Sequence, residues 1–218
     1  MFFNFQCIMM LVSFLVSLRL LKKSSLFHLK YFPLYTTVGI VVMIPMLLFI
    51  YTNLKIINLE FTFSFADLIN NYSLIFNFSF LGVFLIINMP DKKSYFILWI
   101  LFFLFLIGII SSILFSAKNN PNNIAFAVNH FGLIIFSIIF FKKLFYNLPE
   151  KNIFNYSTFW IVTGIVFCSV VSFPLFYFVD FLIKSSMYNE DNRLFFNIRP
   201  FSYGVMHIFF SKAFKCSA

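Results

Sequence analysis

Residues 94–116 read SYFILWILFFLFLIGIISSILFS, an unbroken apolar run without a charged side chain. An α-helix rises 1.5 Å per residue, so about 20 such residues cross the hydrocarbon core of a bilayer. Lipid offers the backbone no hydrogen-bond partner, and a helix satisfies its own N–H and C=O groups within one segment. The run lacks the two-residue alternation of a membrane β-barrel strand. It therefore predicts a transmembrane α-helix.

The composition extends this prediction to the whole chain. Of the 218 residues, 61% are hydrophobic and 11% are charged, and the mean hydropathy is +0.94. A soluble domain needs about a quarter of its residues charged to cover its surface. We therefore expect the outer surface to face lipid. The 38 phenylalanines are expected to serve as lipid-facing bulk rather than as an aromatic binding surface.

Seven apolar stretches are long enough to cross a bilayer, which predicts an all-α integral membrane protein. We expect a single domain over residues 1–218, folded as a seven-helix transmembrane bundle. The connection over residues 55–67 alternates Phe with polar residues and is expected to lie in the interface plane. The predicted spans are Phe2–Leu21, Phe32–Asn53, Leu68–Met89, Ser94–Ser116, Ile124–Tyr146, Tyr156–Ile183 and Leu194–Ala213.

The basic residues predict the orientation, because cytoplasmic loops are enriched in Lys and Arg. No basic residue precedes the apolar part of the first span, and four lie at its end or after it, so we expect the N-terminus outside and the C-terminus in the cytoplasm. The net charge of +9 is then explained by basic loops that set the orientation in the membrane, and it does not require nucleic-acid binding. Eleven basic residues fall on the predicted inner side of what we take to be a bacterial cytoplasmic membrane: Arg19, Lys22, Lys23, Lys30, Lys92, Lys93, Lys142, Lys143, Lys151, Lys212 and Lys215. Five fall outside: Lys55, Lys118, Lys184, Arg193 and Arg199.

Ionisable groups inside predicted spans are the first candidates for function, because they are costly in lipid. Asp180 lies near the outer end of the sixth span and Arg199 near the outer end of the seventh. These spans are consecutive and antiparallel, so we expect the two side chains to pair. His130, in the outer third of the fifth span, is a candidate proton-sensing or ligand-contacting group. The alternative for all three is structural: an ion pair that pins two helices, and an interfacial histidine.

Two helical faces carry further polar residues. Arg199, Tyr203 and His207 recur every four residues and share a broad face. Asn77 belongs to a polar stripe on the third span, which we expect to face other helices, and Gly108 and Gly164 are small enough to allow close helix packing. The candidate pocket, expected to open to the outer side, comprises Asp180, Arg199, His130, Asn77 and Tyr203.

Catalytic and metal-binding patterns are missing from the sequence. Cys7, Cys168 and Cys216 are scattered without the spacing of a metal site or a disulfide framework. No intramembrane carboxylate pair, HExxH motif, nucleophile elbow or phosphate-binding glycine loop occurs. We therefore expect no metal and no cofactor, and an enzyme is the least favoured class.

Several stretches resemble a family of small uncharacterised bacterial seven-helix membrane proteins, often encoded near two-component signalling genes. They are Tyr31-Phe32-Pro33, Asn77-Phe78-Ser79-Phe80, Phe159-Trp160-Ile161-Val162-Thr163-Gly164 and Met206-His207-Ile208-Phe209-Phe210-Ser211-Lys212-Ala213-Phe214. The resemblance supports the count of seven helices. As the function we expect a membrane sensor or signalling-input component without its own output domain, with a small or lipidic ligand and a membrane or kinase protein as its partner. The alternative is a transporter or an accessory subunit of a membrane complex.

Overall fold

The computed structural model describes residues 2–18, 31–41, 59–89, 95–115, 123–146, 152–184 and 193–216. Regular structure in these residues is helical throughout, without a strand, which confirms the all-α prediction. A short 3₁₀ turn, η3 (Ile153–Asn155), precedes α7. The α-helices are α1 (Phe2–Leu18), an unlabelled helix at Phe32–Val41, α4 (Leu59–Ile87), α5 (Tyr95–Phe115), α6 (Asn123–Tyr146), α7 (Ser157–Lys184) and α8 (Arg193–Cys216).

Three helices in the described part of the chain are long and apolar enough to cross a membrane, where the sequence predicted seven. They lie at Tyr95–Phe115, Asn123–Tyr146 and Ser157–Phe178. α8 differs because it carries Arg193, Arg199, Lys212 and Lys215, which lower its mean hydropathy. The remaining apolar helices are shorter over the described residues: Gln6–Leu18, Phe32–Val41 and Asn71–Ile87.

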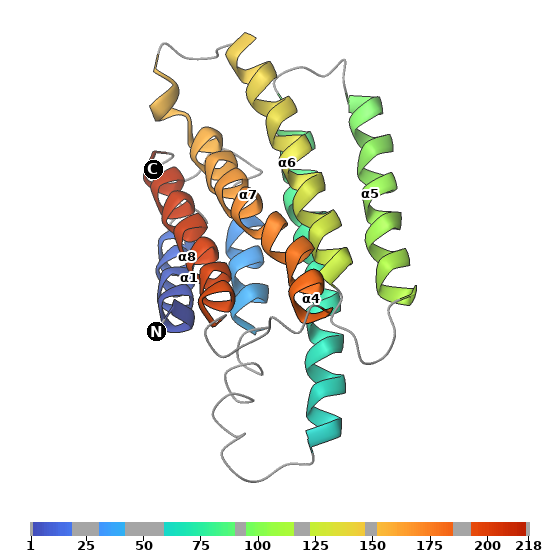
Figure 1. The fold of residues 1–218 in the computed structure, drawn as a ribbon. Helices are drawn as coiled ribbons and strands as arrows, with labels where there is room; N and C mark the ends of the chain where they lie inside the picture. The colour runs from blue at the N-terminus through green and yellow to red at the C-terminus, as the bar shows by residue number, and fades with distance from the viewer. Residues whose placement is uncertain are drawn as a thin grey trace.

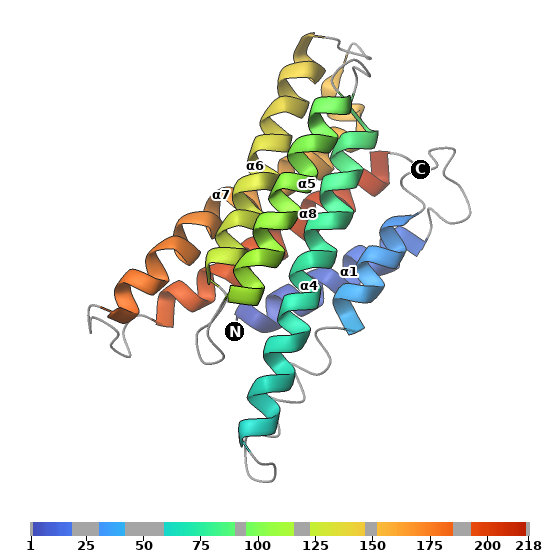
Figure 2. The ribbon, with the colours of Figure 1, turned by 90° about the vertical axis from the view of Figure 1, so that its right-hand side faces the viewer.

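The helix ends agree with the sequence prediction where charged or polar residues flank an apolar run. The ends of α5, α6 and α7 fall within one residue of the predicted bounds. α4 is different, because it begins at Leu59 and its backbone is helical through the segment expected to lie in the interface plane. Its first turns project beyond the other helices (Figures 1 and 2). Hydropathy marks where a helix could enter lipid, whereas α4 itself begins several residues before that point.

α8 is enclosed by its neighbours. It packs against α1 on one side and α7 on the other, while α6 packs against α7, α5 and α4 (Figure 1). α1 and α8 run in the same direction, and α7 runs antiparallel to α8 (Figures 1 and 2). The most polar helix thus lies between two others, which bury its Ser202 and His207 side chains, whereas Lys212 and Lys215 near its C-terminal end are exposed.

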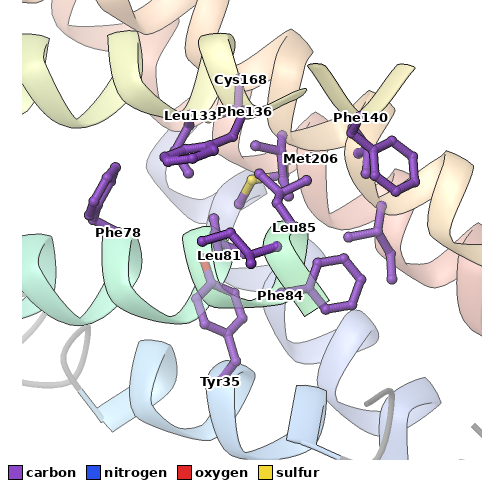
Figure 3. Close-up of a cluster of buried hydrophobic side chains, with 14 of the residues drawn as sticks. Tyr35, Phe78, Leu81, Phe84, Leu85, Leu133, Phe136, Phe140, Cys168 and Met206 are labelled. Carbon is purple, nitrogen blue, oxygen red and sulfur yellow. The ribbon is translucent and has the colours of Figure 1, made fainter. Parts of the chain in front are cut away.

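Phenylalanine fills the interior as well as the surface, which corrects the expectation that it serves only as lipid-facing bulk. The Phe32 ring is fully buried and lies 5.0 Å from the Phe84 ring of α4 and 5.2 Å from the Phe210 ring of α8. Figure 3 shows the core cluster, in which side chains of α4, α6, α7 and α8 interdigitate. Other rings are exposed, including Phe96 and Phe115 on α5.

Gly164 sets the spacing of α7 and α8. A Cβ placed on it would lie 3.0 Å from the Phe209 Cβ and 3.1 Å from the Met206 carbonyl oxygen of α8. Any larger side chain would separate the two helices. This confirms the prediction that Gly164 permits close helix packing.

Candidate ligand-binding site

Three aromatic rings from three helices surround the Arg199 guanidinium. Its Cζ lies 4.7 Å from the Phe126 ring centroid of α6 and 5.0 Å from the Phe176 ring centroid of α7. The Tyr203 ring, one turn along α8, is 5.8 Å away. These distances are within the roughly 6 Å range of cation–π attraction, which strengthens when the cation is desolvated. The rings hold the cation where α6, α7 and α8 meet.

His130 contacts two of the same rings. Its imidazole stacks on Phe176 with centroids 5.7 Å apart, and meets Tyr203 edge-on at 6.2 Å. Nδ1 lies 3.4 Å from the Ser169 hydroxyl oxygen, whereas Nε2 is buried and has no hydrogen-bond partner among the described residues. The structure therefore brings together three of the predicted site residues, His130, Arg199 and Tyr203. We call these three the polar cluster.

Further buried polar atoms lie along the same helices. Asn129 is 0% exposed, and neither its amide nitrogen nor its oxygen has a partner within the described part of the chain. His207, two residues before the Phe209 that packs on Gly164, likewise has both ring nitrogens buried without partners there. An unsatisfied buried polar group costs about 1–3 kcal/mol. The candidate pocket predicted from the sequence did not include Asn129, although it is adjacent to His130 in the sequence.

A thiol and two hydroxyls join α7 to α8 next to the polar cluster, and the sequence prediction missed them as a group. The Ser172 and Ser202 oxygens lie 3.3 Å apart, and the Cys168 sulfur is 3.8 Å from the Ser202 oxygen. The Ser202 hydroxyl also donates to the Arg199 carbonyl at 2.8 Å. The spacing of Cys168 and Ser172 by four residues is the signal that could have found this contact, since it places both on one face of α7.

Asn77 lies in a separate contact. The Tyr35 hydroxyl donates to the Asn77 Oδ1 at 2.7 Å, linking the Phe32–Val41 helix to α4. The prediction that Asn77 faces another helix is confirmed. No contact among the described residues joins Asn77 to the polar cluster, although Tyr35 belongs to the same buried core as Cys168 (Figure 3).

The predicted pairing of Asp180 with Arg199 stays a prediction, because the Asp180 side chain lies outside the described side chains. Its backbone position is one turn beyond Phe176 on α7. Residues four apart lie on the same side of a helix, and Phe176 is the α7 ring that contacts Arg199.

Within the described residues, no group of three or more His, Cys, Asp or Glu side chains is placed to hold a metal ion. The site is instead built from one guanidinium, one imidazole, hydroxyls and aromatic rings. Such groups can hydrogen-bond and attract an anionic or polar solute. Comparison with protein-family models, with curated proteins and with solved structures finds no match to this chain.

Proposed function

We propose that this chain is a multi-pass membrane protein that acts as a sensor or signalling-input component. In this proposal it crosses a bacterial cytoplasmic membrane seven times, with the N-terminus outside. The three long apolar helices support a membrane location. α5 buries only Leu98, Phe102 and Ile109, and its remaining surface is apolar, as a lipid-facing helix requires.

The observation that carries the proposed sensing role is the buried polar cluster. His130 of α6 and Arg199 of α8 converge on the Phe176 ring of α7, and both also contact the Tyr203 ring. The Nε2 of His130 has no partner among the described residues, which is a cost to the fold. A binding site keeps such a cost because the ligand supplies the missing partner. We propose that a small or lipidic ligand reaches this cluster from the outer side.

Ligand binding at this position would act on the packing of α6, α7 and α8, because α6 and α8 supply the polar cluster and α7 supplies the Phe176 ring that His130 and Arg199 contact. A change in that packing is a signal that a second protein can detect. We propose a kinase or another membrane protein as the partner.

A transporter or an accessory subunit of a membrane complex is the second candidate. The observation that favours it is His207, whose two ring nitrogens are buried without partners in the described residues. It lies one turn beyond Tyr203 on α8, so polar groups continue from the cluster along the helix axis. A translocation path needs polar groups that continue along the helix axis, whereas a sensor does not.

The substitution His130→Phe separates a ligand site from a structural role. Phenylalanine keeps the stacking on Phe176 and removes the nitrogen that has no partner among the described residues, at the cost of only the long 3.4 Å contact between Nδ1 and the Ser169 hydroxyl. We expect purified His130→Phe in detergent to be at least as thermally stable as the wild type. A structural histidine predicts a loss of about 1 kcal/mol or more instead.

The same variant is then tested for ligand response. A panel of carboxylic acids, amino acids, phosphates and short-chain lipids is screened for a rise in Tm, with Ser112→Ala on α5 as the control. We expect a solute that stabilises the wild type and Ser112→Ala but has no effect on His130→Phe. Equal stabilisation of all three proteins by every active solute would contradict the site. Uptake of the active solute into protein-containing vesicles would favour the transporter.

A further inference from the structure

The end of the bundle away from the polar cluster carries a second group of charged and aromatic side chains. Lys212 and Lys215 are exposed and lie three residues apart near the end of α8, so they share one side of the helix. α6 ends at the same end of the bundle, with Lys142 and Lys143 in its last turns (Figures 1 and 2). The sequences of α6, η3 and α8 contain no Asp or Glu. This end of these helices is therefore uniformly positive.

Trp160 occupies a fixed position beside Lys212. Its indole Nε1 donates to the Phe154 carbonyl oxygen of η3 at 2.8 Å. The Lys212 Nζ lies 5.8 Å from the centroid of the indole ring. A tryptophan whose N–H is satisfied and whose ring is partly exposed is typical of a membrane–water interface. The lysine amine is thus held at headgroup depth while its stem can lie along apolar surface.

A line of aromatic rings leads from this amine toward the middle of the bundle. The Trp160 ring stacks on Phe209 with centroids 6.0 Å apart, and Phe209 lies 6.4 Å from Phe167. Phe167 is 36% exposed, and Ile208 beside Phe209 is 46% exposed. The surface formed by α7 and α8 is therefore cationic at the end that carries Lys212, which we call the cationic tip, and apolar along Phe209 and Phe167.

We infer that Lys212, Lys215 and Trp160 form a binding site for the headgroup of an anionic phospholipid. The phosphate would lie between the two amines, and an acyl chain would lie along Phe209 and Phe167. A free phosphate would use only the cationic tip, so the continuous apolar rings favour a lipid. This inference rests on the proposed membrane placement, and it adds a lipid partner at the end of the bundle away from the polar cluster.

Tryptophan fluorescence tests the inference directly, since Trp99 is the only other tryptophan. The Trp99→Phe protein is placed in vesicles that contain phosphatidylcholine or phosphatidylglycerol with brominated acyl chains, which quench a neighbouring indole. We expect phosphatidylglycerol to occupy the site next to Trp160 about fivefold more tightly for each lysine, equivalent to about 1 kcal/mol for each basic residue. The preference should disappear in Lys212→Gln/Lys215→Gln.

The matched control is Lys142→Gln/Lys143→Gln, which removes the same charge from α6 at the same end. It should keep most of the preference. An equal loss in both double variants, or equal quenching by the two lipids in the parent protein, would overturn the site. Reversal of the preference by added inorganic phosphate would assign the site to free phosphate instead. If neither brominated lipid quenches, the membrane placement itself fails, which separates the two proposals.

Discussion

The substitution Gly164→Ala probes the contact that holds α7 against α8. A Cβ at this position would lie 3.0 Å from the Phe209 Cβ and 3.1 Å from the Met206 carbonyl oxygen. Both are tighter than ordinary van der Waals contact, and neither atom can rotate away, because one is backbone and the other is the first side-chain carbon. The helices must therefore move apart by a few tenths of an ångström.

Two opposing contributions set the magnitude. Alanine stabilises a helix by about 1 kcal/mol relative to glycine, whereas overpacking a tight contact costs about 1–3 kcal/mol. We expect Gly164→Ala to lower the free energy of unfolding by about 0–2 kcal/mol. Gly108→Ala on α5 is the matched control, because its Cβ would meet only the Val128 Cγ1 at 3.5 Å. That substitution should instead stabilise by up to about 1 kcal/mol.

The assay is denaturant unfolding of the two variants and the wild type in detergent micelles, followed by circular dichroism. The reasoning requires Gly164→Ala to be less stable than Gly108→Ala by about 1–3 kcal/mol. Equal stability of the two variants, or a more stable Gly164→Ala, would show that α7 and α8 are not packed as closely as described.

Two double-mutant cycles test the remaining interhelical contacts. The first cycle combines Tyr35→Phe with Asn77→Leu. We expect a coupling free energy of about 0.6 kcal/mol, and at most about 1.7 kcal/mol, which is typical of hydrogen bonds between membrane helices. A coupling free energy of zero would contradict this contact between the Phe32–Val41 helix and α4. The second cycle combines Asp180→Asn with Arg199→Gln. We expect each single substitution to reduce the folded yield more than the double substitution does, because a single substitution leaves a lone charge poorly solvated. Strictly additive losses would refute that ion pair.

The helices that the sequence predicted best are those bounded by charge. Lys92 and Lys93 precede α5, and Lys142 and Lys143 fall in the last turns of α6, so the apolar runs have sharp limits. On the N-terminal side of α4, Asp67 directly precedes the predicted start at Leu68, but the helix includes Asp67 and begins eight residues before it. The alternating Phe and polar residues there predicted an interfacial segment, while the described backbone continues as a helix from Leu59. α8 is stabilised by its packing against α1 and α7 rather than by a high hydropathy of its own.

The candidate site could be predicted in part because ionisable groups stand out within apolar runs. His130 and Arg199 were found in this way, and the structure brings them to the same Phe176 ring. The spacing of Cys168 and Ser172 signals a shared face of α7, but it does not identify Ser202 as their partner, because a serine hydroxyl can also bond within its own helix. Tyr35 was missed because a tyrosine near the start of an apolar run also fits a membrane interface.

The direction and number of membrane crossings decide whether the polar cluster is open to the outer side. Single cysteines at positions 118 and 215 test the direction of crossing, in a background where Cys7, Cys168 and Cys216 are replaced by serine. In intact cells a membrane-impermeant maleimide should label the cysteine that replaces Lys118 and spare the one that replaces Lys215, which should react only after permeabilisation. Labelling of position 215 in intact cells, with position 118 protected, would contradict the account.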